Sequence, residues 1–201
     1  MTFTLKLMVR HFRVLISLCG VALALTASAQ PTSELPPVEL LPLIPSGTEY
    51  LAHAVGDLDG DSRQDYVLVV EKQTPDERQR LLLVIIRQPD GSLVSRKNNE
   101  RIVLCSECGG VFGDPFAGIT AGKKTFTVQH YGGSAWRWGS EYQFNYSNRD
   151  DTWQLVRVKT FSFHTSDPEK QEVKTYRPPR DFGLIDIADF DPENFKGVGK
   201  R

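Results

Sequence analysis

The 201-residue sequence has little cysteine and histidine, three and four residues respectively, and no excess of either charge. Its 24 lysines and arginines are matched by 25 aspartates and glutamates, which gives a net charge of −1. A chain without a basic excess or a basic stripe is not expected to bind nucleic acid. The longest apolar run, 14–25, is too short to span a membrane, and no later segment is expected to do so. The length is enough for one domain with a real core.

The first 29 residues have the pattern of a signal peptide. A basic stretch precedes the apolar run, and the letters ASA at 27–29 supply the small residues that signal peptidase accepts. We therefore predict a signal peptide at 1–29 and a periplasmic or secreted protein. Cys19 lies within the apolar run without the small neighbour that a lipidated cysteine usually has, so we interpret it as part of the discarded segment.

The rest of the chain divides into a short arm and one domain. Residues 30–45 contain five prolines and no periodicity, which predicts an extended arm. Residues 46–201 are predicted to form a single all-β domain. Its two cysteines, Cys105 and Cys108, are expected to form a short disulfide because export leads to an oxidising compartment. A redox pair, or a zinc site completed by His130 and His164, remains as an alternative.

Strand signals dominate from residue 49 onward. The aliphatic run 81–86 predicts a strand buried on both faces, and the letters PDGS at 89–92 predict a turn. A hairpin is expected around 122–123, and another turn at 148–151. Apolar residues alternate over 136–146, whereas in 152–165 their parity changes after Leu155, which predicts a bulge. Without helical crossovers, these strands predict an antiparallel meander, either partly propeller-like or a β-sandwich.

Four aspartates gather in the stretch GDLDGDSRQD. Asp57, Asp59, Asp61 and Asp65 stand at positions 1, 3, 5 and 9 of a tight loop, and the carbonyl of Arg63 stands at position 7. Oxygen ligands at this density suit Ca²⁺, whereas Mg²⁺ keeps more waters and zinc prefers nitrogen or sulfur. The pattern therefore predicts a calcium-binding β-turn-β loop. The alternative is a solvated turn without a metal.

The loop is not an EF-hand, because its flanks are strands and the glutamate at position 12 is missing. Residues 57–65 and the aliphatic strand after them resemble the calcium loop of FG-GAP (or VCBS) repeats. That resemblance implies a β-propeller-like setting and a structural Ca²⁺. The departure is Ser62, which stands where the family usually has glycine. No second good copy is present, so a complete multi-blade propeller is not supported.

A second notable stretch, HYGGSAWRW, joins two strands through glycine and serine. Tyr, Trp and Arg are common at interface hot spots, which makes this a candidate recognition loop. An alternative is a glycine-bent turn beside core tryptophans. The serine is not in a G-x-S-x-G elbow, so a nucleophile is not predicted. The candidate partner-binding residues are Tyr131, Gly132, Gly133, Ser134, Trp136 and Arg137.

Two classes of function follow. A single calcium loop on an exported antiparallel scaffold is similar to type-i lysozyme inhibitors and to periplasmic immunity proteins, which insert a Ser/Gly/Tyr-bearing loop into a glycosidase cleft. That resemblance implies a non-enzymatic inhibitory protein with residues 131–134 as the inserted loop. The alternative is a secreted hydrolase or carbohydrate-binding module that uses Trp136, Trp138 and Trp153 as a sugar platform.

Overall fold

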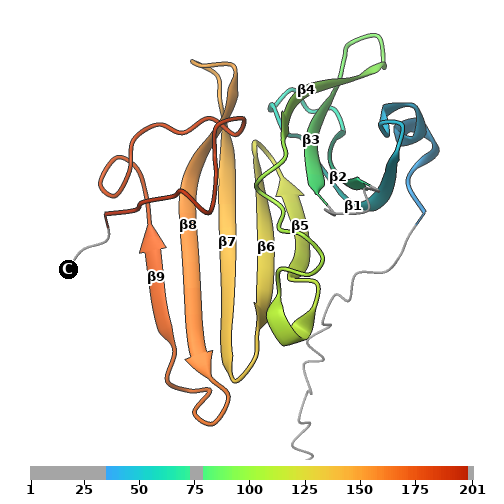
Figure 1. Ribbon diagram of the computed structural model, residues 1–201. Helices are drawn as coiled ribbons and strands as arrows, with labels where there is room; N and C mark the ends of the chain where they lie inside the picture. The colour runs from blue at the N-terminus through green and yellow to red at the C-terminus, as the bar shows by residue number, and fades with distance from the viewer. Residues whose placement is uncertain (1–34, 73–78, 199–201) are drawn as a thin grey trace, which may run out of the picture. The chain divides into compact units, whose positions relative to one another are not determined.

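The first of two antiparallel sheets forms from the N-terminal half of the domain (Figure 1). The computed structural model describes residues 35–72 and 79–198, so the predicted signal peptide lies outside the described residues. The sheet contains, in order, β1 (Thr48–Gly56), β2 (Asp65–Lys72), β3 (Arg80–Arg87) and β4 (Leu93–Asn99). Strands β2 and β3 are buried along nearly their whole length, which confirms the prediction from the aliphatic run.

The second sheet is a five-stranded meander. Its strands are β5 (Phe116–Gly122), β6 (Thr125–Gly133), β7 (Trp136–Ser147), β8 (Thr152–His164) and β9 (Glu172–Tyr176). The predicted bulge is present: Gln143 pairs with Arg157 and Phe144 with Leu155, which leaves Val156 as the extra residue of β8. The apolar parity changes there because one additional residue turns the following side chains to the opposite face.

The main hydrophobic core is shared by the two sheets. Val67 and Val84 of the first sheet belong to one buried cluster with Phe144 and Trp153 of the second, and Phe190 joins it from the C-terminal segment. Strands β1 and β5 approach closely enough that a Cβ on Gly56 would lie 2.8 Å from the carbonyl oxygen of Gly122. The architecture is all-β and consistent with a β-sandwich.

The described part of the N-terminal arm is not extended, contrary to the prediction. Val38–Leu43 forms a 3-10 helix, η1, and Leu40 is fully buried. Leu40 packs with Tyr66, Leu68 and Ile85 in a second cluster on the far side of the first sheet. Burial of this leucine stabilises a turn that the prolines alone do not encode. The helix thereby covers the second face of β2 and β3.

Strand β7 does not have one buried face along its whole length. Tyr142 and Phe144 are buried as the alternation predicts, whereas Trp136 is 64% exposed. The core covers the second half of the strand only. The same periodic pattern therefore faces the protein interior at one end and solvent at the other.

Candidate functional site

The acidic loop between β1 and β2 is anchored in the core by a residue inside it. Leu58 is fully buried, and its carbonyl accepts a hydrogen bond of 3.0 Å from Nε1 of the buried Trp153. The backbone N–H of Lys124, in the β5–β6 turn, donates to the Asp57 carbonyl at 2.7 Å. The loop is thus attached to both sheets. The spacing of the aspartates did not reveal these two long-range anchors.

Three carboxylates meet in this loop. Asp57, Asp59 and Asp61 each offer an oxygen, and these oxygens lie within 4.8 Å of one another, so the cluster could hold a metal ion. One oxygen of each accepts a backbone N–H from within the loop, at 2.8 to 3.1 Å. Burial, and then the neighbouring negative charges, raise the pKa of Asp59. Arg63 forms an ion pair with Asp61 and balances part of the charge.

Asp65, predicted as a fourth ligand, is not one of the three clustered carboxylates. It is fully buried, and its two oxygens accept backbone N–H groups of Leu58 at 2.7 Å and of Arg87 at 2.9 Å. Its carboxylate therefore ties the start of the loop to the end of β3. Burial raises the pKa of Asp65 as well. The Arg63 carbonyl, the other predicted ligand, stays a prediction.

The backbone of the loop is left-handed at two positions. Gly60 has φ +88°, and a Cβ there would overlap the Lys124 side chain, which lies across it. Ser62 has φ 70°, a conformation that costs a residue with a Cβ about 1 kcal/mol. This is the position at which the FG-GAP pattern has glycine. The serine keeps the backbone shape of the loop at some cost in strain.

The β6–β7 connection is a hairpin with defined backbone contacts. The N–H of Gly133 donates to Gly109 at 2.8 Å, and that of Ser134 donates to Trp136 at 2.9 Å. Ser134 and Trp136 are exposed, whereas Gly132 is buried. The backbone of Gly132 is therefore not available as a contact surface. Successive side chains of a strand point to opposite faces, so Trp136 and Arg137 do not share a surface.

An outer aromatic cluster lies on the face of the five-stranded sheet that points away from the core. Its members are linked by ring contacts: Tyr131 to Phe112 at 5.6 Å, Tyr131 to Phe161 at 6.3 Å, and Phe161 to Phe163 at 6.4 Å between centroids. The Arg137 guanidinium lies 3.9 Å from the centroid of the Phe112 ring. Phe112, in the short 3-10 helix η2 (Gly110–Phe112), is half exposed, and no sequence motif indicates its place in this cluster.

The disulfide prediction is confirmed, since Cys105 and Cys108 are bonded to each other. The bonded sulfurs are not available as zinc ligands, whereas the redox alternative stays a prediction. His130 is buried, and burial, together with the charge of Arg80, lowers its pKa to about 4. His164 is on the surface, where it contacts Trp136 at 5.2 Å between ring centroids.

The sugar platform proposed on three tryptophans is wrong for one of them. Trp153 is 1% exposed and donates its indole N–H inside the core, so it cannot stack on a ligand. Trp136 is exposed, and Trp138 is partly exposed. Only these two tryptophans remain accessible.

No protein-family model, curated protein or solved structure matches this chain. The similarity to FG-GAP loops and to lysozyme inhibitors consequently rests on residues 57–70 and 131–134 alone. Among the residues that the structure describes, no helix is long and apolar enough to cross a membrane.

Proposed function

We propose that this chain is an exported, non-enzymatic binding protein with a calcium-braced scaffold and a protein-binding surface at the β6–β7 end. The observation that carries the proposal is the outer aromatic cluster, because it combines partly exposed rings with an arginine at one end of the five-stranded sheet. Aromatic residues and arginine dominate the binding energy of many interfaces. The acidic loop lies apart from this surface and has a structural role.

Calcium is the ion that suits the acidic loop. Three carboxylates supply hard oxygen ligands, and Ca²⁺ accepts the irregular geometry and additional waters that such a loop allows. A bound cation would offset the repulsion among Asp57, Asp59 and Asp61. Because the loop joins β1 to β2 and is hydrogen-bonded to Trp153 of β8 and to Lys124 of the β5–β6 turn, the ion would stabilise the contact between the two sheets.

Thermal melting with calcium or with EGTA tests this role. Free calcium 100-fold above the dissociation constant is expected to raise the midpoint by roughly 5–10 °C. The Asp59→Asn variant should lose this rise. Asp189→Asn, which changes an exposed carboxylate outside the loop, should keep it. Equal midpoints with calcium and EGTA would exclude a calcium-braced loop.

The partner we propose is a lysozyme-like glycosidase. Such enzymes place paired carboxylates in an open cleft. The exposed hydroxyl of Ser134 and the guanidinium of Arg137 supply donors to carboxylates, and the Phe112 ring beside Arg137 adds apolar area. Inhibition would then come from occupation of the cleft and needs no chemistry by this chain.

Inhibition assays with chicken-type, goose-type and invertebrate-type lysozymes test the partner. Inhibition of at least one type is expected, with a loss of about tenfold or more in affinity for Arg137→Ala or Phe112→Ala. Lys123→Ala is the matched control, because Lys123 is an exposed cation at the opposite end of β6. The proposal fails if none of the three types is inhibited, or if the control loses as much affinity as the two test variants.

A further inference from the structure

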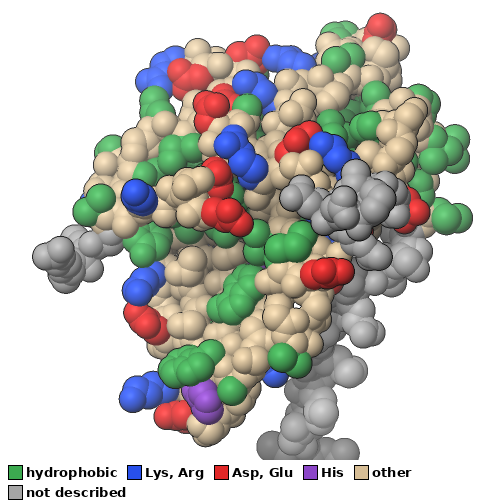
Figure 2. Space-filling model, in the orientation of Figure 1, with side chains coloured by type: hydrophobic (Ala, Val, Ile, Leu, Met, Phe, Trp, Pro, Cys, Tyr) green, Lys and Arg blue, Asp and Glu red, His purple; other side chains and the backbone are tan. Residues whose placement is uncertain are grey.

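The inner face of the five-stranded sheet is covered over only part of its length. The C-terminal segment crosses this face, where Phe190 contacts Tyr142 at 5.1 Å and Phe195 contacts Tyr176 at 5.7 Å between centroids (Figure 1). Beyond that segment, β7, β8 and β9 continue with the same face open. Figure 2, in the same orientation, shows this lower region as mostly tan, the colour of polar side chains such as Ser and Thr and of backbone.

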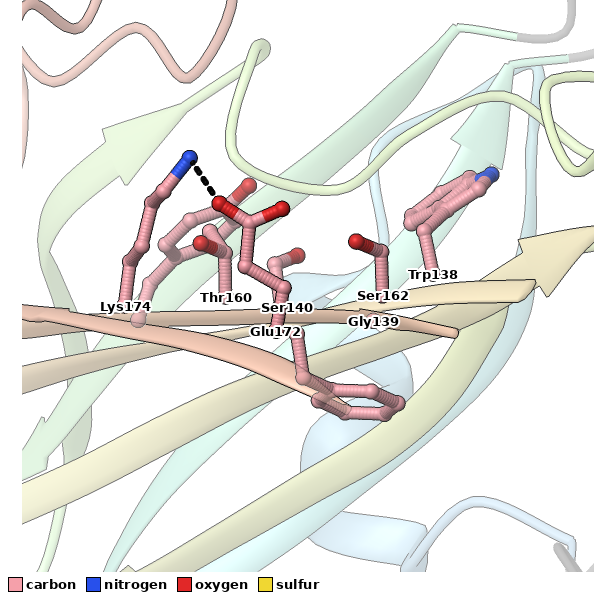
Figure 3. A pocket seen from close by; sticks show the side chains of 9 residues that line it. Trp138, Gly139, Ser140, Thr160, Ser162, Glu172 and Lys174 are labelled. Carbon is pink, nitrogen blue, oxygen red and sulfur yellow. Dashed lines mark ion pairs between the residues drawn. The ribbon is translucent and has the colours of Figure 1, made fainter. Parts of the chain in front are cut away.

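The strand register places six side chains of this open face in two rows. Trp138, Ser162 and Glu172 pair across the three strands in one row, and Ser140, Thr160 and Lys174 pair in the next. Residues that pair directly across antiparallel strands point to the same face. The two rows line a hollow of about 300 Å³. Figure 3 shows Trp138 at one end and Lys174 at the other, with Glu172 and the hydroxyl side chains between them.

A third row extends the hollow into a groove. Tyr142, Val158 and Tyr176 pair across the same strands, and they line a second hollow of about 410 Å³ that also includes Thr160. Three rows span four residue steps, which is about 13 Å along the strands. The side chains change along the groove from aromatic and aliphatic, beside Phe195, to hydroxylated, and end at an indole. This size is within the range of small-ligand sites, about 300–1,000 Å³.

The indole of Trp138 packs against a glycine on the neighbouring strand. It pairs with Gly132 of β6, and a Cβ at that position would lie 2.8 Å from Cζ2 of the indole. The indole therefore rests on bare backbone. Glu172 and Lys174 form an ion pair of 2.7 Å at the edge of the groove, with both side chains largely exposed. Such an exposed pair contributes little to stability.

We propose that this groove binds a short neutral oligosaccharide. A pyranose ring has an apolar C–H face, which fits the indole of Trp138, and equatorial hydroxyls, which both donate and accept. Ser162 and Thr160 can do the same, Glu172 accepts and Lys174 donates, so the groove offers both donors and acceptors to sugar hydroxyls. The balanced charge of the pair gives no preference for an anionic ligand. The site lies on the opposite face from the outer aromatic cluster and is independent of the proposed protein partner.

Titration of the isotope-labelled full chain, followed by NMR, tests the proposal. The probes are tri-N-acetylchitotriose, cellotriose and maltotriose. The three tryptophans give three indole N–H signals, and the buried Trp153 serves as an internal reference. At least one probe is expected to shift the Trp138 signal saturably while the Trp153 signal stays in place. If no probe moves the Trp138 signal, the groove is not a carbohydrate site.

Variants then locate the binding. Trp138→Ala should weaken binding by about tenfold or more, and Thr160→Val, which keeps the side-chain volume but removes a hydroxyl, by about threefold to tenfold. Trp136→Ala is the matched control, two residues along the same strand, and should bind normally. An unchanged Trp153 signal shows that each variant is folded. Binding that survives Trp138→Ala, or that is lost equally in Trp136→Ala, would overturn the assignment.

Discussion

The two sheets of this protein are built from similar hairpins but are buried to different extents. In the four-stranded sheet, β2 and β3 lie between the main core on one side and the η1 cluster on the other. In the five-stranded sheet, β7 and β8 run for 12 and 13 residues, and only part of one face is covered. The central strands of the first sheet therefore contribute to stability through both faces. The second has free surface on both faces, and both proposed binding surfaces lie there.

The largest loss of stability is expected on substitution of Arg80, which links the first sheet to the segment that connects the two sheets. Arg80 is 1% exposed; it pairs with Glu71 at 2.8 Å and with both oxygens of Asp114 at 2.6 to 2.7 Å. Arg80→Met removes the cation but leaves the carboxylates, one of them buried. Urea unfolding should show a loss of about 3–5 kcal/mol in the free energy of unfolding.

An ion pair on the open sheet provides the contrast to Arg80. Lys159 of β8 pairs with Glu141 at 2.8 Å, and its side chain is 34% exposed. Lys159→Met is expected to change the free energy of unfolding by less than about 1 kcal/mol, because solvent screens the pair. Equal losses for the two variants would contradict the difference in burial between the sheets.

The covered part of the second sheet should contribute a pH dependence of stability through a buried histidine. His130 is 2% exposed, and burial lowers its pKa from 6.5 to about 4. The unfolded chain therefore binds a proton at higher pH than the folded chain, so stability is lost as the pH falls from 6.5 towards 4. The loss attributable to this residue is about 3 kcal/mol.

Comparison of the wild type with His130→Gln isolates this contribution. Urea unfolding from neutral pH to about pH 4 should give a shallower decline for the variant, since glutamine does not titrate. The carboxylates titrate in both proteins and therefore largely cancel in the difference. Parallel curves would show that His130 is not held neutral by the fold.

The acidic loop allows two aspartates with different roles to be compared. Asp65→Asn replaces one of two accepting oxygens by an NH2 group that faces a backbone N–H, which should cost about 2 kcal/mol whether or not calcium is present. Asp59→Asn removes charge from the cluster, so its cost should appear only with calcium. Unfolding of both variants with calcium and with EGTA separates the roles. If the loss of stability depended on calcium for Asp65→Asn but not for Asp59→Asn, the two assigned roles would be reversed.

Several features could be predicted because their signal is local. The aliphatic run at 81–86 requires burial on both faces, and the parity change after Leu155 requires one extra residue in the strand. The pair Cys105 and Cys108 is close enough in sequence to be joined within a turn. In each case the neighbouring residues determine the structure, and the rest of the chain only accommodates it.

Other features depend on contacts between distant segments. The burial of Leu40 depends on the outer face of β2 and β3, and the role of Asp65 depends on the N–H of Arg87, which is 22 residues away. The groove exists because the C-terminal segment stops short of the ends of β7 to β9. The alternation in β7 indicates which residues share a face, but it does not indicate where the cover of that face ends.

The smallest change in stability is expected at Trp136, at the end of β7 that the core does not cover. Trp136 and Trp153 are both tryptophans in strands of the second sheet, yet Trp136 is 64% exposed and Trp153 is 1% exposed. Trp136→Ala should change the free energy of unfolding by no more than about 0.5 kcal/mol, because it leaves no cavity. Trp153→Ala, its reference, should lose about 3–5 kcal/mol and release the acidic loop from its anchor. If Trp136→Ala were as costly as Trp153→Ala, the end of β7 would be part of the core, and the open groove beside it would not exist.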